Sequence, residues 1–249
     1  MINGVINVYK EPGYTSHDVV AKLRGILKQK KIGHMGTLDP NAVGVLPVCL
    51  GKATKLCNLL SEKDKTYSWQ INFCYCNVYN FAMSWRSFYF FSLSCKIIDI
   101  TITKIDLPRV SFHVTCSKGT YVRTLCYDIG KDLGVGACME KLTRTRVERF
   151  DIKDSISLSQ IEEIRDQGVL EQYITPVDEI LDMYSKCMVS EEAEKLLYNG
   201  IIFTSRNTLL KMNHQDGQTV RVYTHDGKFI GLYMYIAEKQ IYKPIKIFL

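Results

Sequence analysis

An aspartate held between glycines and a proline is the first residue whose surroundings suggest chemistry. Asp39 ends the segment GHMGTLD at residues 33–39 and directly precedes Pro40. The two glycines and the proline impose loop geometry, and a residue before proline is steered out of the α region. A carboxylate fixed in one orientation could attack a substrate covalently or stabilise positive charge that develops on it. An ordinary Asp-Pro turn residue without a chemical role is the alternative.

A positive side chain that could pair with this carboxylate is Arg123, in the segment SKGTYVRT at residues 117–124. A guanidinium binds a carboxylate through two parallel hydrogen bonds and stays charged at any physiological pH. We therefore expect an ion pair between Asp39 and Arg123. The alternative is that Arg123 is a solvated surface residue on the first turn of a helix.

Basic residues elsewhere could form a surface that binds phosphates. The net charge of +6 is a modest excess that fits a polyanionic partner without proving one. The residues that could line one phosphate-binding face are Lys22, Arg24, Lys28, Lys30, Lys31, Lys141, Arg144, Arg146 and Arg149. For the lysines at 28–31 the alternative is a solvated helix end, because a helix C-terminus favours cations.

The elements that must position these residues are predicted from spacing. Thr15 and Asp18 have the spacing of a capping box, and a helix with one apolar face follows them. Residues 110–116 alternate as a half-buried strand does, and the helix after them ends at Gly134. Near the C-terminus, Asp226 and Gly227 lie between two apolar runs and predict a hairpin. The chain therefore reads as an α+β protein, with one domain over 1–180 and a small, mostly β domain over 181–249.

Composition excludes several classes of protein. Hydrophobic residues make up 46% of the chain and charged residues 23%, which is incompatible with wholesale disorder or a collagen-like repeat. No apolar run reaches 18 residues, and the opening residues lack the pattern of a secretory leader, so we expect neither a membrane span nor secretion. Nine cysteines without a CxxC pair favour a reducing cytoplasm. The histidines at 17, 34, 113, 214 and 225 show no metal-ligand spacing, so no metal is expected.

Three segments together closely resemble one family. They are GHMGTLDPNAVGVLPVCLGKATK (33–55), KTY (65–67) and CSKGTYVRTLCYDIGKDLGVGA (116–137). They resemble the bacterial tRNA pseudouridine synthase B family, and the similarity covers about 1–72 and 96–249. The resemblance implies a mixed-sheet pseudouridine-synthase fold with a small PUA-like C-terminal domain. It also implies an isomerase that needs no metal or cofactor and converts the T-loop uridine, position 55 of tRNA, to pseudouridine. We expect the protein to be a cytoplasmic monomer.

The same resemblance implies a role for each matching residue. Asp39 would be the nucleophile that meets a base flipped out of the RNA, Arg123 its ion-pair partner, and Tyr67 the residue that stacks on the base and handles a proton at carbon 5. The implied substrate-binding residues are His34, Tyr121, Leu142 and Lys10. The implied contacts to the backbone of the T arm are Lys28, Lys30, Lys31, Arg144 and Arg146. Core packing is the alternative for Tyr121 and Leu142, and Glu11 is inserted where it could displace Lys10.

One stretch departs from the family pattern. Residues 73–95 hold nine aromatic residues, three cysteines and a single charge, Arg86, without a clear period. The RNA-gripping insertion expected after Tyr67 is missing. A deletion with a reading-frame slip would explain this, and lineage-specific remodelling is the alternative. The loss predicts a chain that is less stable and binds tRNA more weakly than an intact relative. A catalytically impaired RNA-binding protein that retains the scaffold is thus the second functional hypothesis.

Overall fold

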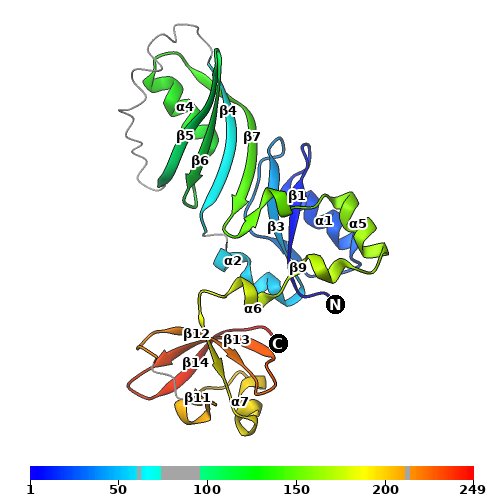
Figure 1. Ribbon diagram of the computed structural model, residues 1–249, viewed down its shortest axis with the longest axis vertical. Coiled ribbons are helices and arrows are strands. Elements are labelled where there is room, and N and C mark those ends of the chain that lie inside the picture. The colour runs from blue at the N-terminus through cyan, green and yellow to red at the C-terminus, as the bar shows by residue number, and fades with distance from the viewer. Residues whose placement is uncertain (61–62, 74–95, 211–213) are drawn as a thin grey trace. The chain divides into compact units, whose positions relative to one another are not determined.

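The structure is a computed structural model that describes residues 1–60, 63–73, 96–210 and 214–249 (Figure 1). Its contacts divide it into two compact units. The larger unit comprises Ile6–Cys49 and Leu56–Tyr173, and the smaller unit comprises Met1–Val5, Leu50–Lys55 and Ile174–Leu249. The boundary predicted after residue 180 falls at the end of helix α6 (Val177–Ile180), inside the smaller unit. The atypical stretch predicted over 73–95 lies, apart from Phe73, outside the described residues.

A mixed β-sheet organises the larger unit. Within the described residues of this unit its strand order is β5-β6-β4-β7-β3-β1, with β2 paired to β3 and β8 paired to β7. Strand β4 runs antiparallel to both β6 and β7, whereas β3 pairs with β7 in parallel. This confirms the predicted mixed sheet. The strands are β1 (Gly4–Lys10), β2 (Ile32–His34), β3 (Val43–Leu50), β4 (Lys65–Phe73), β5 (Ile97–Asp106), β6 (Arg109–Cys116), β7 (Ala137–Val147) and β8 (Phe150–Asp151).

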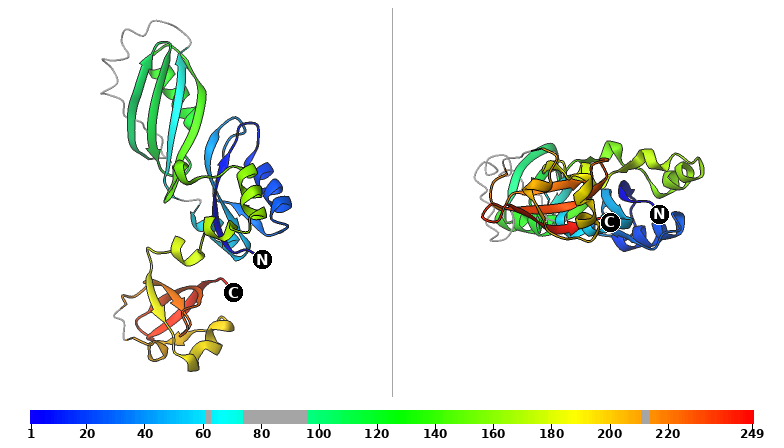
Figure 2. Two further views of the ribbon diagram at one scale, coloured as in Figure 1. Left: turned by 45° about the vertical axis from the view of Figure 1, so that its right-hand side comes forward. Right: turned by 90° about the horizontal axis from the view of Figure 1, so that it is seen from below.

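Helices begin where the sequence supplies caps. Thr15 and Asp18 form the predicted capping box at the start of α1, and Ser157 with Gln160 forms another at the start of α5. Figure 1 and the left view of Figure 2 show α4 lying along the strands β4–β7. The helical segments of the larger unit are α1 (Ser16–Ile26), α2 (Cys57–Leu60), α4 (Val122–Asp132), η4 (Ile152–Asp154), α5 (Leu158–Asp166) and η5 (Leu170–Tyr173).

A hydrophobic core lies between α4 and the sheet, and it includes Tyr67 and Leu142. Trp69 and Phe112 project from neighbouring strands, and their ring centroids are 5.0 Å apart. Leu125 and Ile129 from α4 belong to the same buried cluster. Burying such side chains stabilises the fold by roughly 1.5–3 kcal/mol each. This packing fixes the N-terminal end of α4, where Arg123 is found, against β4 and β7.

The smaller unit is a second sheet with short helices. Its strand order is β10-β12-β13-β14-β11, and Gly227 has a φ of 87° in the turn of the predicted hairpin. The predicted α+β fold class with a mostly β C-terminal part is confirmed (Figure 2). Its elements are most of η1 (Gly51–Leu56), β9 (Ile174–Thr175), α6, β10 (Ser185–Met188), η6 (Glu191–Ala193), α7 (Glu194–Tyr198), β11 (Phe203–Thr204), η7 (Ser205–Asn207), β12 (Thr219–Tyr223), β13 (Phe229–Ile236) and β14 (Ile241–Ile247). Across the described residues, every helix is too short or too polar to cross a lipid bilayer.

Candidate active site

A pocket in the larger unit collects five of the residues predicted from the sequence. It has a volume of about 380 Å³ and opens among the loop after β2, strands β4 and β7, and the start of α4. The predicted residues that line it are Asp39, Tyr67, Tyr121, Arg123 and Leu142. These positions are far apart in the sequence, so the fold brings them together.

The expected ion pair between Asp39 and Arg123 is present at this pocket. Arg123 Nε lies 3.0 Å from Asp39 Oδ2, and Nη2 donates to Oδ1 at 3.2 Å. The side chains are 36% (Asp39) and 62% (Arg123) exposed, so the pair lies at the surface. An exposed ion pair contributes little to stability because water screens it. The carboxylate is therefore both oriented by the guanidinium and accessible to a ligand.

Lys10 holds the loop that carries Asp39. Its Nζ donates to the carbonyl oxygens of Pro40 at 3.0 Å and Ala42 at 2.6 Å, and the residue is fully buried. Burial lowers the pKa of Lys10, and the nearby charge of Arg144 lowers it further. The expectation that Lys10 binds substrate directly is therefore wrong for this structure. Its ammonium group is hydrogen-bonded to backbone carbonyls and positions the loop instead.

Arg144 is also buried, which overturns the prediction that it contacts an RNA phosphate. It is fully inaccessible, and its guanidinium donates to the carbonyl oxygens of Val45 at 2.8 Å, Thr37 at 3.2 Å and Gly36 at 3.3 Å. It also has a side-chain hydrogen bond with Tyr67. Arg144 thus ties the loop before Asp39 to the tyrosine in the pocket.

A β-bulge explains why Arg144 points inward while Arg146 is exposed. On strand β4, Thr66 pairs with Arg146 and the next residue, Tyr67, pairs with Arg144, so β7 contributes one extra residue at this point. Residues two apart on a regular strand share a face, but a bulge interrupts that alternation and redirects side chains. Arg146 thus remains available for the predicted phosphate contact, and Arg144 does not.

Gly44 allows strand β3 to approach Arg144 closely. It pairs with Arg144 in the parallel register and has a φ of +107°, in the region that favours glycine. A Cβ atom there would lie 2.3 Å from the Arg144 carbonyl oxygen. Any side chain at this position would therefore push β3 away from β7 and disturb the carbonyls that hold the guanidinium.

Tyr67 reaches the pocket from a mostly buried position. Only 7% of the residue is exposed, and burial raises the pKa of its phenol despite the nearby positive charge of Arg144. The phenol is therefore protonated at neutral pH. The Tyr67 side chain lines the pocket, and its hydroxyl is hydrogen-bonded to Arg144.

Tyr121 and Leu142 behave differently from each other. Tyr121 is 70% exposed, so the alternative of core packing is excluded for it. Leu142 is 8% exposed and belongs to the core cluster under α4, yet it also lines the pocket. Leu142 therefore forms part of the apolar wall of the pocket, and Tyr121 is an exposed aromatic residue that also lines it.

His34 does not line the pocket but lies next to the loop that does. Its ring is 5.1 Å from that of His17 in an edge-to-face arrangement, and within the described part of the chain its buried Nδ1 has no hydrogen-bond partner. Burial lowers the pKa of His34, followed by the charges of His17 and Arg144. We therefore expect a neutral imidazole, which stays a candidate for contacting the substrate without carrying charge.

The exposed basic residues and one overlooked lysine complete the surroundings. Lys28, Lys30, Lys31 and Arg146 are exposed, as a phosphate-binding surface requires. Lys65 lines the pocket and was not singled out in the sequence. Alternation along β4 could have identified it, because residues two apart on a strand share a face and Lys65 precedes Tyr67 by two.

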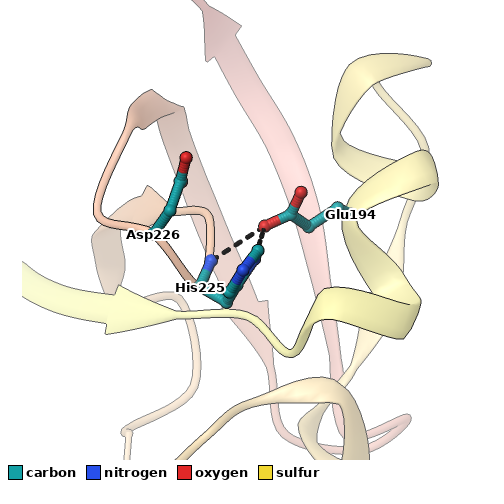
Figure 3. A group of neighbouring side chains, drawn as sticks. All are labelled: Glu194, His225 and Asp226. Carbon is teal, nitrogen blue, oxygen red and sulfur yellow. Dashed lines mark hydrogen bonds and ion pairs between the residues drawn. The ribbon is translucent and has the colours of Figure 1, made fainter.

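A second polar cluster, formed by Glu194, His225 and Asp226, lies in the smaller unit (Figure 3). Glu194 accepts a hydrogen bond from the backbone N–H of His225 at 2.9 Å and pairs with its ring Nδ1, and ligand atoms of Glu194, His225 and Asp226 lie within 4.8 Å of one another. Such a set could in principle hold a cation. The Glu194 oxygen is already engaged by His225, and Asp226 accepts from Thr224. The arrangement is explained by closure of the hairpin onto α7.

Comparisons with known proteins place the chain in a family. The sequence profile described as "TruB family pseudouridylate synthase (N terminal domain)" matches residues 24–77, and "tRNA pseudouridylate synthase B C-terminal domain" matches residues 123–182. The tRNA pseudouridine synthase B of Lachnoclostridium phytofermentans is 38% identical over 307 aligned positions, covering 100% of both chains. The enzyme of the same name from Clostridium novyi is 36% identical, covering 94% of this chain and 96% of that one.

Solved structures agree with the sequence relatives. A chain in the "Structure of H/ACA RNP bound to a substrate RNA containing 2'-deoxyuridine" superposes with a TM-score of 0.83 at 28% identity, covering 99% of this chain and 85% of that one. A chain in the "archaeal box H/ACA sRNP Nop10-Cbf5 complex" gives 0.81 at 29% identity, covering 99% and 86%. With relatives more than 30% identical along nearly its whole length, this chain belongs to the TruB family of tRNA pseudouridine synthases, which are isomerases.

Proposed function

We propose that this chain isomerises the T-loop uridine, position 55 of tRNA, to pseudouridine, with Asp39 as the nucleophile and the target base flipped out of the RNA. The observation that carries the proposal is the two-pronged ion pair between Asp39 and Arg123 at the mouth of a pocket lined by Tyr67 and Tyr121. Family membership supports the reaction class, and the pocket supports the assignment of roles.

The reaction requires cleavage of the glycosidic bond between N1 and C1′, rotation of the base and formation of a bond between C1′ and carbon 5. Carbon 5 then loses its proton and N1 gains one, so that the product is an isomer of the substrate. Asp39 can attack the nucleotide or stabilise positive charge at C1′, because its carboxylate is accessible and held by Arg123. Tyr67 supplies an aromatic face for the flipped base and a phenol near the site of proton transfer. These steps use only side chains of this protein.

Recognition of the tRNA would come from shape and charge. The exposed residues Lys28, Lys30, Lys31 and Arg146 can contact phosphates of the T arm without reading sequence. Selection of the target would come from the loop conformation and the extruded base. The small β-rich C-terminal part would support the acceptor side of the tRNA.

The decisive experiment uses an unmodified T-arm stem–loop with tritium at carbon 5 of the target uridine. We expect the wild type to release tritium, and Asp39→Asn to release none while it still binds the RNA. Asp99→Asn is the matched control, because Asp99 is an exposed aspartate on β5 outside the pocket. Binding by the wild type without tritium release would instead favour the second hypothesis, an RNA-binding protein that has lost catalysis.

A further inference from the structure

The exposed face of helix α4 carries an aromatic residue between two cations. The helix buries Val122, Leu125, Cys126 and Ile129 against the sheet. Residues four apart on a helix are neighbours on its surface. Arg123, Tyr127 and Lys131 have this spacing and are all exposed. The opposite side of α4 is therefore a basic stripe with a tyrosine at its centre.

Two tyrosines on this side are unusually exposed. Tyr121 is 70% and Tyr127 is 63% exposed, although each offers a large apolar ring. In the part of the chain that the structure describes, neither side chain has a hydrogen bond or a ring contact. An exposed aromatic pair that contributes nothing to the core is a common sign of a binding surface.

A shallow cavity lies between these rings and adjoins the active pocket. Its volume is about 360 Å³, and it is lined by Tyr121, Arg123, Thr124 and Tyr127. Tyr121 and Arg123 line the active pocket as well. A strand that delivers one nucleotide to Asp39 would therefore have its neighbouring nucleotide close to Tyr127.

The positive charges around Tyr127 favour a polyanionic partner over a basic or neutral one. Lys131 lies one turn further along α4 on the same side as Tyr127, and Lys118 is exposed just before the helix. The acidic residues Asp128 and Asp132 are turned away by about 100° and 140° around the helix axis, given 3.6 residues per turn. Aromatic faces combined with cations are the usual means of binding single-stranded nucleic acid.

We propose that Tyr127, with Tyr121 and the flanking cations, forms a second stacking site for an unpaired RNA base next to the flipped target. This inference rests on the proposed function for the identity of the RNA, but it concerns binding rather than chemistry. The ring of Tyr127 replaces stacking that the neighbouring base loses when the loop opens, and Lys131 neutralises the adjoining phosphate.

The test compares Tyr127→Ala with Tyr127→Phe, using T-arm stem–loops that carry 2-aminopurine at each loop position flanking the target in turn. Stacking on a tyrosine quenches this fluorophore, so we expect quenching at one position with the wild type and with Tyr127→Phe. Tyr127→Ala should lose that quenching and bind the stem–loop about tenfold more weakly, within the usual contribution of one stacked base. Its kcat at saturating RNA should stay unchanged while KM rises.

Tyr173→Ala is the matched control, because Tyr173 is 45% exposed and does not line either cavity. Melting temperature measured for each variant separates a binding defect from a folding defect. Equal affinity and equal quenching for Tyr127→Ala and the wild type would overturn the proposal, as would a loss of the same size in Tyr173→Ala. Tyr127-dependent quenching without any tritium release would leave this site standing while the proposed catalysis fails.

Discussion

Three cations lie around the loop that bears Asp39, and they have two different roles. Lys10 and Arg144 are buried, and their donors end on backbone carbonyls of that loop and of β3. Only Arg123 reaches the carboxylate itself. A buried cation needs several acceptors to offset lost hydration, and these carbonyls supply them. The loop is therefore held by these buried side chains, so that the surface guanidinium of Arg123 suffices to orient the Asp39 carboxylate.

Arg144 should be more important for folding than its chemical type suggests. Arg144→Met removes the donor for three carbonyls and for Tyr67, and we expect it to destabilise the fold by about 3 kcal/mol or more. Arg146→Met is the control two residues along the same strand, and should change stability by less than about 0.5 kcal/mol because Arg146 is exposed. Urea unfolding measures both. Similar midpoints for the two variants would contradict the structural role of Arg144.

Tyr67 is expected to matter for chemistry and for alkaline stability. Removing the hydroxyl in Tyr67→Phe should lower kcat by about a hundredfold, as loss of a proton-transferring group commonly does, with RNA affinity nearly unchanged. Because burial raises the pKa of the folded phenol, the unfolded chain releases this proton first. Stability is then fully present below about pH 10 and falls as the pH rises towards the folded pKa.

The stability side of this prediction is read from urea midpoints at about pH 8 and pH 10.5. Tyr67→Phe should lose less stability than the wild type over this interval, since the titrating group is gone. Tyr173→Phe serves as the control, because that tyrosine is exposed. An equal loss in wild type and Tyr67→Phe would show that Tyr67 is not the group responsible.

At the scale of elements, local signals predict ends and periods but not bulges. The capping box at the start of α1 is set by two side chains three positions apart, Thr15 and Asp18, so the sequence contains all of it. The bulge on β7 depends on how that strand pairs with Tyr67 on β4. A spacing of two residues therefore predicts that Arg144 and Arg146 share one face of the strand. Only the pairing of β7 with β4 shows that their side chains point to different sides.

The contact between α7 and the β12–β13 turn should depend on pH through His225. Its hydrogen bond to Glu194 raises the pKa of His225, so the charged form is favoured in the folded unit. The stability from this pair is fully present below about pH 6.5 and is lost as the pH rises through the folded pKa of His225. The other charges facing the ring, Glu191 and Asp226, act in the same direction.

An NMR titration of the His225 ring measures this directly. In Glu194→Gln the pKa of His225 should move down towards its ordinary value. The protection of the turn amides against hydrogen exchange, relative to an unfolded chain at the same pH, should then lose most of its pH dependence. Glu192→Gln is the control, since Glu192 is a neighbouring exposed acid without a hydrogen bond to the ring. An unchanged His225 pKa in Glu194→Gln would contradict the ion pair.

At the scale of the whole molecule, the meeting of distant segments was predictable only through family resemblance. The residue types suggest that Asp39 and Arg123 could pair, but no rule about sequence spacing connects positions so far apart. The motifs shared with the family are what predict this pair. The division into units was not predictable, because Met1–Val5 and Leu50–Lys55 belong to the smaller unit with the C-terminal residues. The burial of Lys10 and Arg144 was missed for a similar reason, since charged residues are almost always exposed unless they are paired.

The basic surface should give RNA binding a defined dependence on salt. Each phosphate contact releases counterions and adds about 0.7–0.9 to the slope of log Kd against log salt concentration. The triple variant with Lys28, Lys30 and Lys31 changed to alanine should therefore reduce the slope by about 2 to 3 for a T-arm stem–loop. Lys104→Ala should leave it unchanged, because that exposed lysine pairs with Asp106 on β5. A triple variant that weakens binding equally at all salt concentrations would show that these lysines shape the fold and do not contact phosphates.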